Sequence, residues 1–242
     1  MEPFEYTNAI ALELSNSCSH AWLHKKCPLN LEMAQPGVNK DPRTLPLSIV
    51  QKVMGTLGEY EYSGALAFHQ YNEPLQDPRL FLFLAMAQEL CPSAQPYIVT
   101  NGYNLTPTLA EELITYGVRK IIVSTMNDKI MLRRVVALQE LVGKERIEAH
   151  NSAMLDDRML AYDVPKPIPK GHCHAPLRQV IITRDAKVGL CCHDWQRIYT
   201  FGDLREEKLD DILCSDEVRQ VYEGLRKNKR GYFLCRQCGR SR

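Results

Sequence analysis

The segment YIVTNGYNLTPTLAEELITYGVRKIIVST, residues 97–125, predicts a strand, a helix and a second strand in immediate succession. The apolar runs at its two ends are typical of buried strands. Between them, Thr106 and the proline after it favour a helix start, and Gly117 favours a helix end. Two strands joined by one helix in this way run parallel, with a right-handed crossover. The segment therefore predicts a parallel α/β sheet.

The same alternation extends in both directions from this segment. Further strands are expected at residues 9–14, 64–69 and 146–150, and further helices at 45–57, 77–90 and 128–143. Five or six such units are fewer than the eight of a closed TIM barrel. We therefore expect residues 1–165 to form a partial (β/α)6 TIM-like barrel, with its chemistry at the carboxyl ends of the strands.

The pattern changes after a connector rich in proline, VPKPIPKGHCHAP at residues 164–176. Residues 178–195 predict a β-hairpin, and residues 208–213 and 216–227 predict short helices. We therefore expect residues 166–242 to form a second, smaller domain that is rich in cysteine and built from a hairpin and helices.

Composition excludes several classes of partner. The 242 residues carry a formal net charge of +1, so no global field attracts nucleic acid or an anionic membrane. The sequence contains neither an apolar run long enough to span a membrane nor a secretory signal, and a cytoplasmic location is expected. Nine cysteines in a reducing compartment favour metal ligation or catalysis over disulfides.

Four of the cysteines near the end of the sequence have the spacing of a metal site. The CxxC pair Cys235 and Cys238 lies in a polar segment with little core to bury it, so ligation is favoured. Cys173 and Cys191 complete a four-thiolate set. Such a set holds zinc or an iron–sulfur cluster, and the spacing leaves both open. Three further thiols are expected to be small buried apolar groups, namely Cys91, Cys192 and Cys214.

Polar residues and two more thiols follow several of the expected barrel strands. Cys18 and Cys27 follow the first strand, Glu73 the second and Asn101 the third, while Ser124 lies at the end of the fourth. Each polar residue is a weak signal alone, because loop charges are commonly solvated and Asn-Gly pairs are common in turns. A parallel sheet places all of them at one edge.

The order of these segments resembles the radical SAM superfamily, specifically its small members with a twitch- or SPASM-type auxiliary domain. The segment ALELSNSC resembles that family's first strand and cluster loop. FHQYNEPLQDPRL resembles the turn that holds the amino group of S-adenosylmethionine, and residues 97–125 resemble the third and fourth strands. IITRDAKVGLCCHDW and LCRQCGR resemble the hairpin and the closing CxxC of the auxiliary domain. The resemblance covers nearly the whole chain.

This resemblance implies two metal sites and one organic cofactor. Cys18 and Cys27 are expected to hold a [4Fe–4S] cluster that binds S-adenosylmethionine and cleaves it to a 5′-deoxyadenosyl radical. The residues expected to contact S-adenosylmethionine are Glu73, Pro74, Asn101 and Ser124. The ligands expected for an auxiliary cluster are Cys173, Cys191, Cys235 and Cys238. A reductant such as flavodoxin or ferredoxin is the expected protein partner.

The loop that carries the first cysteines departs from the family pattern. The family has C-x3-C-x2-C, whereas this chain reads C-x8-C-x2-N, with Asn30 in place of the third cysteine. Asparagine is a poor iron ligand beside thiolates, so His20 and His24 are candidates for that role, as imidazole is in Rieske-type centres. Asn72 replaces the first residue of the family's Gly-Glu turn, and Ala186 replaces its hairpin glycine.

Three interpretations follow from this departure. The first is a working radical SAM enzyme that abstracts hydrogen from a small molecule, in a dehydrogenase-like two-electron oxidation. The second is a binding or scaffold protein of the same fold, which has lost the first cluster and keeps one metal site. In the third, the four-thiolate site holds structural zinc. Glu73, Pro74, Asn101 and Ser124 favour the first, because a scaffold would not need them.

The substrate class and the catalytic base are less constrained. A small molecule is favoured over a peptide, because the chain has no room for a leader-peptide-binding domain; a peptide-modifying maturase is the alternative. The pattern is similar to that of radical dehydrogenases that oxidise an aminocyclitol alcohol. Asp156, Asp157 and Arg158 follow the fifth strand and are candidate bases, although they also suit an exposed helix turn.

Overall fold

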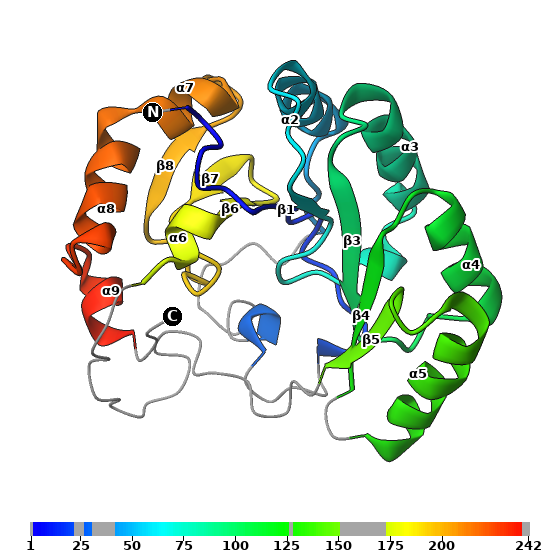
Figure 1. Ribbon diagram of the computed structural model, residues 1–242. Helices are drawn as coiled ribbons and strands as arrows, with labels where there is room; N and C mark the ends of the chain where they lie inside the picture. Colours follow the sequence, from blue (N-terminus) through cyan, green and yellow to red (C-terminus); the bar gives the residue numbers. More distant parts are fainter. Residues whose placement is uncertain (1, 22–26, 31–41, 126–127, 151–172, 239–242) are drawn as a thin grey trace.

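The computed structural model describes residues 2–21, 27–30, 42–125, 128–150 and 173–238 (Figure 1). These residues contain one sheet of eight strands in the order β5-β4-β3-β2-β1-β6-β7-β8. The first six strands of this order run parallel to one another, while β7 and β8 each run antiparallel to the strand before them.

The strands are β1 (Ala9–Leu12), β2 (Ala65–Ala67), β3 (Gln95–Thr100), β4 (Lys120–Ser124), β5 (Ile147–His150), β6 (Gln179–Ile182), β7 (Lys187–Gly189) and β8 (Thr200–Asp203). The helices are α2 (Leu47–Glu59), α3 (Leu80–Leu90), α4 (Pro107–Thr115), α5 (Lys129–Val142), α6 (Ala175–Arg178), α7 (Leu209–Cys214), α8 (Asp216–Arg226) and α9 (Phe233–Gln237). A 3-10 turn, η2, covers Pro74–Gln76.

The expected partial barrel of six parallel strands is confirmed. Its sixth strand is β6, which pairs with β1 rather than with β5. The sequence predicted this segment only as half of a hairpin, and β6 does pair antiparallel with β7. One strand therefore belongs both to the barrel sheet and to the hairpin that leads to Cys191. The expected domain boundary at residue 165 lies outside the described residues.

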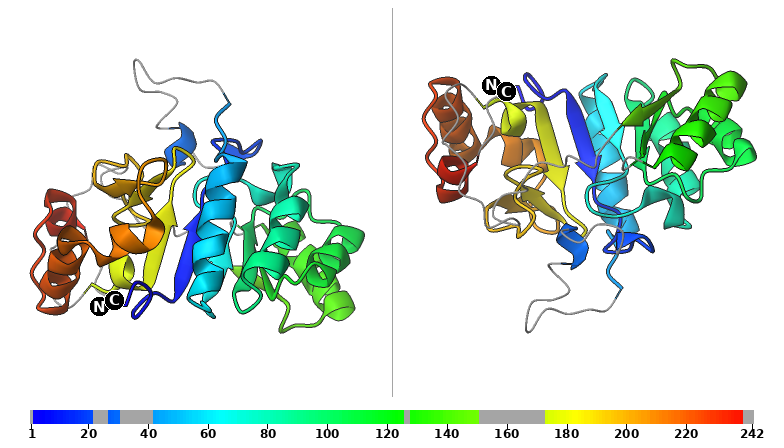
Figure 2. Two further views of the ribbon diagram at one scale, coloured as in Figure 1. Left: turned by 90° about the horizontal axis from the view of Figure 1, so that it is seen from above. Right: turned by 90° about the horizontal axis from the view of Figure 1, so that it is seen from below.

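The parallel strands bury one face under helices. Successive side chains of a strand point to opposite faces, and Ile10, Leu66 and Ile98 lie in the main core with residues of α2 to α5. Figures 1 and 2 show α3, α4 and α5 along one side of β3 to β5. The opposite face carries Ala11 and Ala67. These two alanines form a small buried cluster with Ile181, and Tyr97 and Cys192 pack against it.

The predicted ends of α4 are confirmed. The hydroxyl oxygen of Thr106 accepts a hydrogen bond of 3.1 Å from the backbone N–H of Leu109, which caps the start of the helix. Gly117 follows the helix with a φ of +86°, a conformation that favours glycine. Within the described residues, no helix has the length and apolar character needed to cross a membrane.

A buried ion cluster joins the first strand to the hairpin. Glu13 follows β1 and Arg184 follows β6, and neither side chain is exposed to solvent. The guanidinium of Arg184 donates to Glu13 Oε1 at 2.9 Å, and that of Arg197 donates to both carboxylate oxygens at 2.6 and 2.8 Å. Charges removed from water are tolerated only when they are paired in this way. The cluster fixes the loop after β7, which contains Arg197 and Cys191, against β1.

Candidate functional site

The loop after β1 brings Cys18 and Cys27 into one site. Both thiols pack against a small apolar cluster formed by Leu29, Tyr71 and Trp195. The two thiols are close enough for a negative charge on Cys27 to raise the pKa of Cys18. We call Cys18 and Cys27, with the loop that carries them, the front site.

The sulfur of Cys18 accepts two hydrogen bonds. One comes from the backbone N–H of His20, and the other comes from the side-chain amide of Asn101, with an N–S distance of 3.8 Å. Burial raises the pKa of the Cys18 thiol, and the N–H of His20 opposes this by favouring the thiolate. Because the thiolate is the form that binds metal, a cation must displace the thiol proton here.

Glu73 joins the loop after β2 to the end of β3. Its side chain is buried, and its carboxylate accepts three hydrogen bonds. Oε1 accepts from the hydroxyl of Thr100 at 2.6 Å and from the N–H of Leu75 at 3.2 Å, while Oε2 accepts from the N–H of Asn101 at 2.8 Å. Burial raises the pKa of Glu73 and these donors oppose the rise. The carboxylate therefore braces the two loops, and its own hydrogen-bonding capacity is largely used.

Asn101 lies between Glu73 and Cys18. Its backbone N–H binds Glu73, its side-chain amide reaches Cys18, and its Oδ1 accepts from the N–H of Tyr103 at 3.0 Å. The next residue must be glycine, because Gly102 has a φ of +77° and a Cβ there would lie 2.6 Å from a methyl carbon of Val123. The Asn-Gly turn therefore links Glu73 to Cys18 in a fixed geometry.

The other predicted cofactor contacts lie at the same sheet edge. Pro74 is buried and begins η2 directly after Glu73. Ser124 ends β4 and pairs in register with His150 of β5. Among the described residues, no hydrogen bond joins Ser124 to Cys18, Glu73 or Asn101. Ser124 therefore shares the edge with these residues but not their hydrogen-bond network.

The candidate third ligands of the front site have other contacts in this structure. The ring of His20 stacks on Tyr103, with centroids 4.1 Å apart, and its Nδ1 lies 2.8 Å from the hydroxyl of Ser19. The side-chain amide of Asn30 donates to the carbonyl of Ala21 at 2.7 Å, which closes the loop on itself. The remaining candidate ligand, His24, and the candidate bases at residues 156–158 lie outside the described residues.

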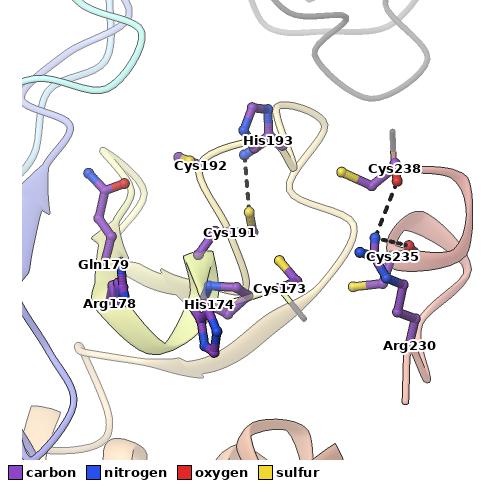
Figure 3. Close-up of a pocket in the computed structure, with 12 residues that line it drawn as sticks. Cys173, His174, Arg178, Gln179, Cys191, Cys192, His193, Arg230, Cys235 and Cys238 are labelled. Carbon is purple, nitrogen blue, oxygen red and sulfur yellow. Dashed lines mark hydrogen bonds between the residues drawn. The ribbon is translucent and has the colours of Figure 1, made fainter. Parts of the chain in front are cut away.

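The four cysteines predicted to form the second metal site line one cavity of about 230 Å³. Figure 3 shows Cys173 and Cys191 on one side and Cys235 and Cys238 on the other. Cys173 precedes α6 and Cys191 follows β7, while the CxxC pair lies in and just after α9. One water needs only about 10–15 Å³ of such space. The cavity therefore has room for a group much larger than one ion.

Hydrogen bonds hold two of the loops around this cavity. Arg230 donates to the carbonyl oxygens of Cys235 and Cys238, both at 3.2 Å, and so fixes the CxxC turn. The N–H of His193 donates to the sulfur of Cys191 at 3.4 Å (Figure 3). Hydrogen bonds of this kind to cluster sulfurs tune the potential of iron–sulfur centres.

The thiols of the second site need a cation to ionise. Burial raises the pKa of Cys235 to about 11, and the neighbouring Cys173 and Cys238 add to the rise. The pKa of Cys191 is also raised, first by its hydrogen bond with Cys192 and then by burial. Within the described residues, no three His, Cys, Asp or Glu side chains are arranged around a single ion position. Four thiols around a cavity of this size fit a [4Fe–4S] cluster.

Residues outside the predicted set join the two sites. The hydroxyl of Tyr71, whose ring packs on Cys18 and Cys27, donates to the carbonyl of Cys192 at 2.6 Å. Trp195, four residues after Cys191, packs on the same front cluster. Both aromatic residues lie in segments that resemble the family, but nothing in the sequence predicts that they contact each other and the thiols of the front site. Cys91 is buried in the main core, as predicted.

The comparison with known families bears on the second site. Residues 173–239 match the SPASM family, described as an iron–sulfur cluster-binding domain. We call these matched residues the SPASM domain. All four cysteines around the cavity lie within the SPASM domain, which favours an iron–sulfur cluster over zinc at this site.

The match to known proteins extends beyond the SPASM domain. The S-adenosyl-L-methionine-dependent 2-deoxy-scyllo-inosamine dehydrogenase of Niallia circulans is 26% identical to this chain over 235 residues, which are 95% of this chain and 91% of the relative. The chain as a whole, and not only its SPASM domain, is therefore similar to that protein.

Solved structures have the same fold. BtrN in complex with AdoMet and 2-DOIA superposes with a TM-score of 0.79 at 23% identity, covering 97% of this chain and 93% of BtrN. Native anSMEcpe with bound AdoMet gives a TM-score of 0.51 at 10% identity, covering 96% of this chain and 88% of anSMEcpe. The predicted resemblance to radical SAM proteins with a SPASM domain is confirmed, and β6 of the partial barrel lies within the residues that match the SPASM family.

Proposed function

We propose that this protein is a radical SAM oxidoreductase that acts on a small molecule. The observation that carries the proposal is the chain of contacts from Cys18 through Asn101 to Glu73 at the carboxyl edge of the sheet. This chain of contacts runs from one thiol of the front site to the turn expected to hold S-adenosylmethionine, and so supports the proposal. The similarity to a dehydrogenase that depends on S-adenosyl-L-methionine supports the same conclusion.

The front site would hold a [4Fe–4S] cluster through Cys18 and Cys27, with a third ligand from the same loop. His20 and His24 are the candidates for that ligand. When bound, the cluster and S-adenosylmethionine supply a 5′-deoxyadenosyl radical, an oxidant that removes hydrogen from unactivated carbon. The protein supplies orientation: Glu73 holds Asn101 and the turn before Pro74 in place, and Ser124 offers a hydroxyl further along the edge.

The second site would hold an auxiliary cluster through Cys173, Cys191, Cys235 and Cys238. Four thiolates satisfy all four irons of a [4Fe–4S] cluster. The substrate would therefore not bind this cluster directly, and the cluster would be available to accept an electron. This arrangement suits a two-electron oxidation in which the substrate loses a hydrogen atom, a proton and an electron.

The proposed substrate is a small hydroxylated molecule, and the proposed electron donor to the front cluster is a flavodoxin or a ferredoxin. The relative from Niallia circulans is named for the dehydrogenation of 2-deoxy-scyllo-inosamine, which is a compound of this class. A scaffold role is the second candidate, because Asn30 occupies the position of the third cysteine and binds Ala21 instead.

Anaerobic reconstitution with iron and sulfide tests the proposal. We expect about eight irons per chain, which is two [4Fe–4S] clusters, and formation of 5′-deoxyadenosine when S-adenosylmethionine and dithionite are added. Cys18→Ala should lose about half of the iron and all of the 5′-deoxyadenosine. Cys91→Ala removes a core thiol outside both sites and is the matched control. One cluster and intact S-adenosylmethionine in the wild type would favour the scaffold.

A further inference from the structure

His69 is a partly buried histidine that none of the sites above uses. It lies two residues beyond β2, on the face shared by Ala65 and Ala67, because side chains alternate along a strand. Its Nδ1 atom is buried and has no hydrogen-bond partner in the part of the chain that the structure describes. A buried polar atom left unpaired costs about 1–3 kcal/mol. Such an atom in a folded protein indicates a partner other than the described residues.

An aromatic ring and small side chains surround His69. Its ring lies edge-to-face against Tyr97 of β3, with centroids 5.3 Å apart and planes at 84°. Tyr97 packs on the face that carries Ala11 and Ala67, and Cys192 contacts the same group from the SPASM domain. Ala11 of β1 and Ala67 of β2 are the small side chains on this face, next to the rings of His69 and Tyr97. A small molecule placed there would meet His69 and Tyr97 together.

The charge states of these two rings select the chemistry of the ligand. Burial lowers the pKa of His69 to about 4, so its imidazole is neutral at neutral pH and carries one nitrogen that accepts a hydrogen bond. Burial also raises the pKa of Tyr97 to about 12, so its hydroxyl stays protonated. A neutral acceptor beside a neutral hydroxyl suits an alcohol better than it suits a carboxylate or a phosphate.

The loop that carries His69 is tied to the SPASM domain. The side-chain amide of Gln70 and the hydroxyl of Tyr71 both donate to the carbonyl oxygen of Cys192, at 3.1 and 2.6 Å. Cys192 directly follows Cys191, one of the proposed auxiliary ligands. A molecule bound at His69 would therefore lie beside the loop of the auxiliary cluster.

We infer that His69 binds the hydroxyl group of a small cyclic alcohol or amino alcohol, and that it accepts the hydroxyl proton when this alcohol is oxidised. The inference rests on the proposed function. Oxidation of an alcohol to a ketone removes a hydrogen atom from carbon, a proton from oxygen and one electron. The His69 ring nitrogen accepts the proton, and the bound S-adenosylmethionine and an oxidised iron–sulfur cluster would supply the acceptors of the hydrogen atom and of the electron.

Two substitutions separate binding from proton transfer. The measurements use reconstituted holoenzyme with S-adenosylmethionine, and 2-deoxy-scyllo-inosamine is the probe. His69→Phe removes the acceptor, and we expect probe affinity by calorimetry to fall about tenfold. His69→Gln keeps an acceptor that cannot take up a proton, so affinity should stay within about threefold while ketone formation falls at least about 100-fold. Formation of 5′-deoxyadenosine should persist in His69→Gln.

The outcomes are distinct. Equal affinity of the wild type and His69→Phe, a wild-type rate of ketone formation in His69→Gln, or a wild type that does not bind the probe would each overturn the role of His69. Iron content at the wild-type level confirms that a variant is folded. If His69→Phe is not folded, His69→Gln alone is used for the test. A wild type that binds the probe but forms no 5′-deoxyadenosine would reject the proposed function and leave the binding role of His69 supported.

Discussion

The hydroxyl of Tyr71 donates a hydrogen bond of 2.6 Å to the carbonyl oxygen of Cys192. This bond joins the loop after β2, which packs on the front site, to the loop after β7, which carries Cys191. Trp195 from the second loop packs against Tyr71 and the thiols of the front site. The front site and the loop that carries Cys191 are therefore joined by one shared group of side chains.

Tyr71→Phe tests this link. The substitution removes one hydrogen bond and keeps the ring, so the free energy of unfolding should fall by about 1 kcal/mol, which lowers Tm by roughly 2–4 °C for a chain of this size. Thermal denaturation followed by circular dichroism measures the change. Tyr103→Phe is the control, because no described contact involves the Tyr103 hydroxyl and its ring stacking on His20 is kept. Equal Tm values for both variants would show that the link has no energetic weight.

Glu73→Gln tests the brace at the carboxyl edge. A glutamine side chain cannot accept from Thr100, Leu75 and Asn101 as the carboxylate does, because one of its two polar ends is a donor. We expect a loss of about 1–3 kcal/mol in the free energy of unfolding by urea, and weaker binding of S-adenosylmethionine. Glu89→Gln, on an exposed position of α3, should change stability by less than about 0.5 kcal/mol. Similar behaviour of the two variants would contradict the role of Glu73.

Glu13→Gln tests the buried ion cluster. Loss of the carboxylate charge leaves the buried Arg184 with only Asp185, 4.0 Å away, as an anion, and breaking a buried pair in this way costs about 3–5 kcal/mol. Urea unfolding of the holoprotein measures the cost. Glu148→Gln breaks the exposed pair with Lys120, and its effect should stay below about 1 kcal/mol. A Glu13→Gln variant as stable as Glu148→Gln would mean that water or another group compensates Arg184.

The pKa of His69 predicts a loss of stability in acid. Its pKa is lowered from 6.5 to about 4 in the folded protein, so between these values the unfolded chain binds more protons and unfolding becomes easier as the pH falls. At about pH 5 the wild type should therefore lose about 1–2 kcal/mol more than His69→Gln, relative to about pH 7. Urea unfolding at the two pH values measures this difference. Parallel losses in both proteins would show that His69 is not held neutral by burial.

Much of the fold could be predicted because the parallel units repeat locally. Each helix and strand between residues 45 and 150 follows from periodicity and turn residues in its own segment. The place of β6 could not be predicted in this way. Its residues, Gln179–Ile182, pair with β1, and that register depends on long-range packing rather than on the segment itself.

The candidate site also contains some features that the sequence predicts and others that depend on long-range contacts. The clustering of Cys173, Cys191, Cys235 and Cys238 follows from a CxxC pair and two further thiols, and the structure places all four around one cavity. The position of Glu73 is also predictable, but its bonds to Thr100 and Asn101 are not, because they join separate strands. A buried histidine is usually structural, so the sequence offers no reason to select His69, whose unpaired nitrogen is visible only in the structure.

The front site decides whether the protein is an enzyme of the proposed kind. Electron paramagnetic resonance on the reduced Cys235→Ser/Cys238→Ser double variant isolates that site, because the auxiliary cluster loses two proposed ligands. We predict a [4Fe–4S] signal that changes when S-adenosylmethionine is added, and that is absent when Cys18→Ser is combined with the double variant. A double variant without a cluster signal, or with one that S-adenosylmethionine leaves unchanged, would contradict radical chemistry at Cys18 and Cys27.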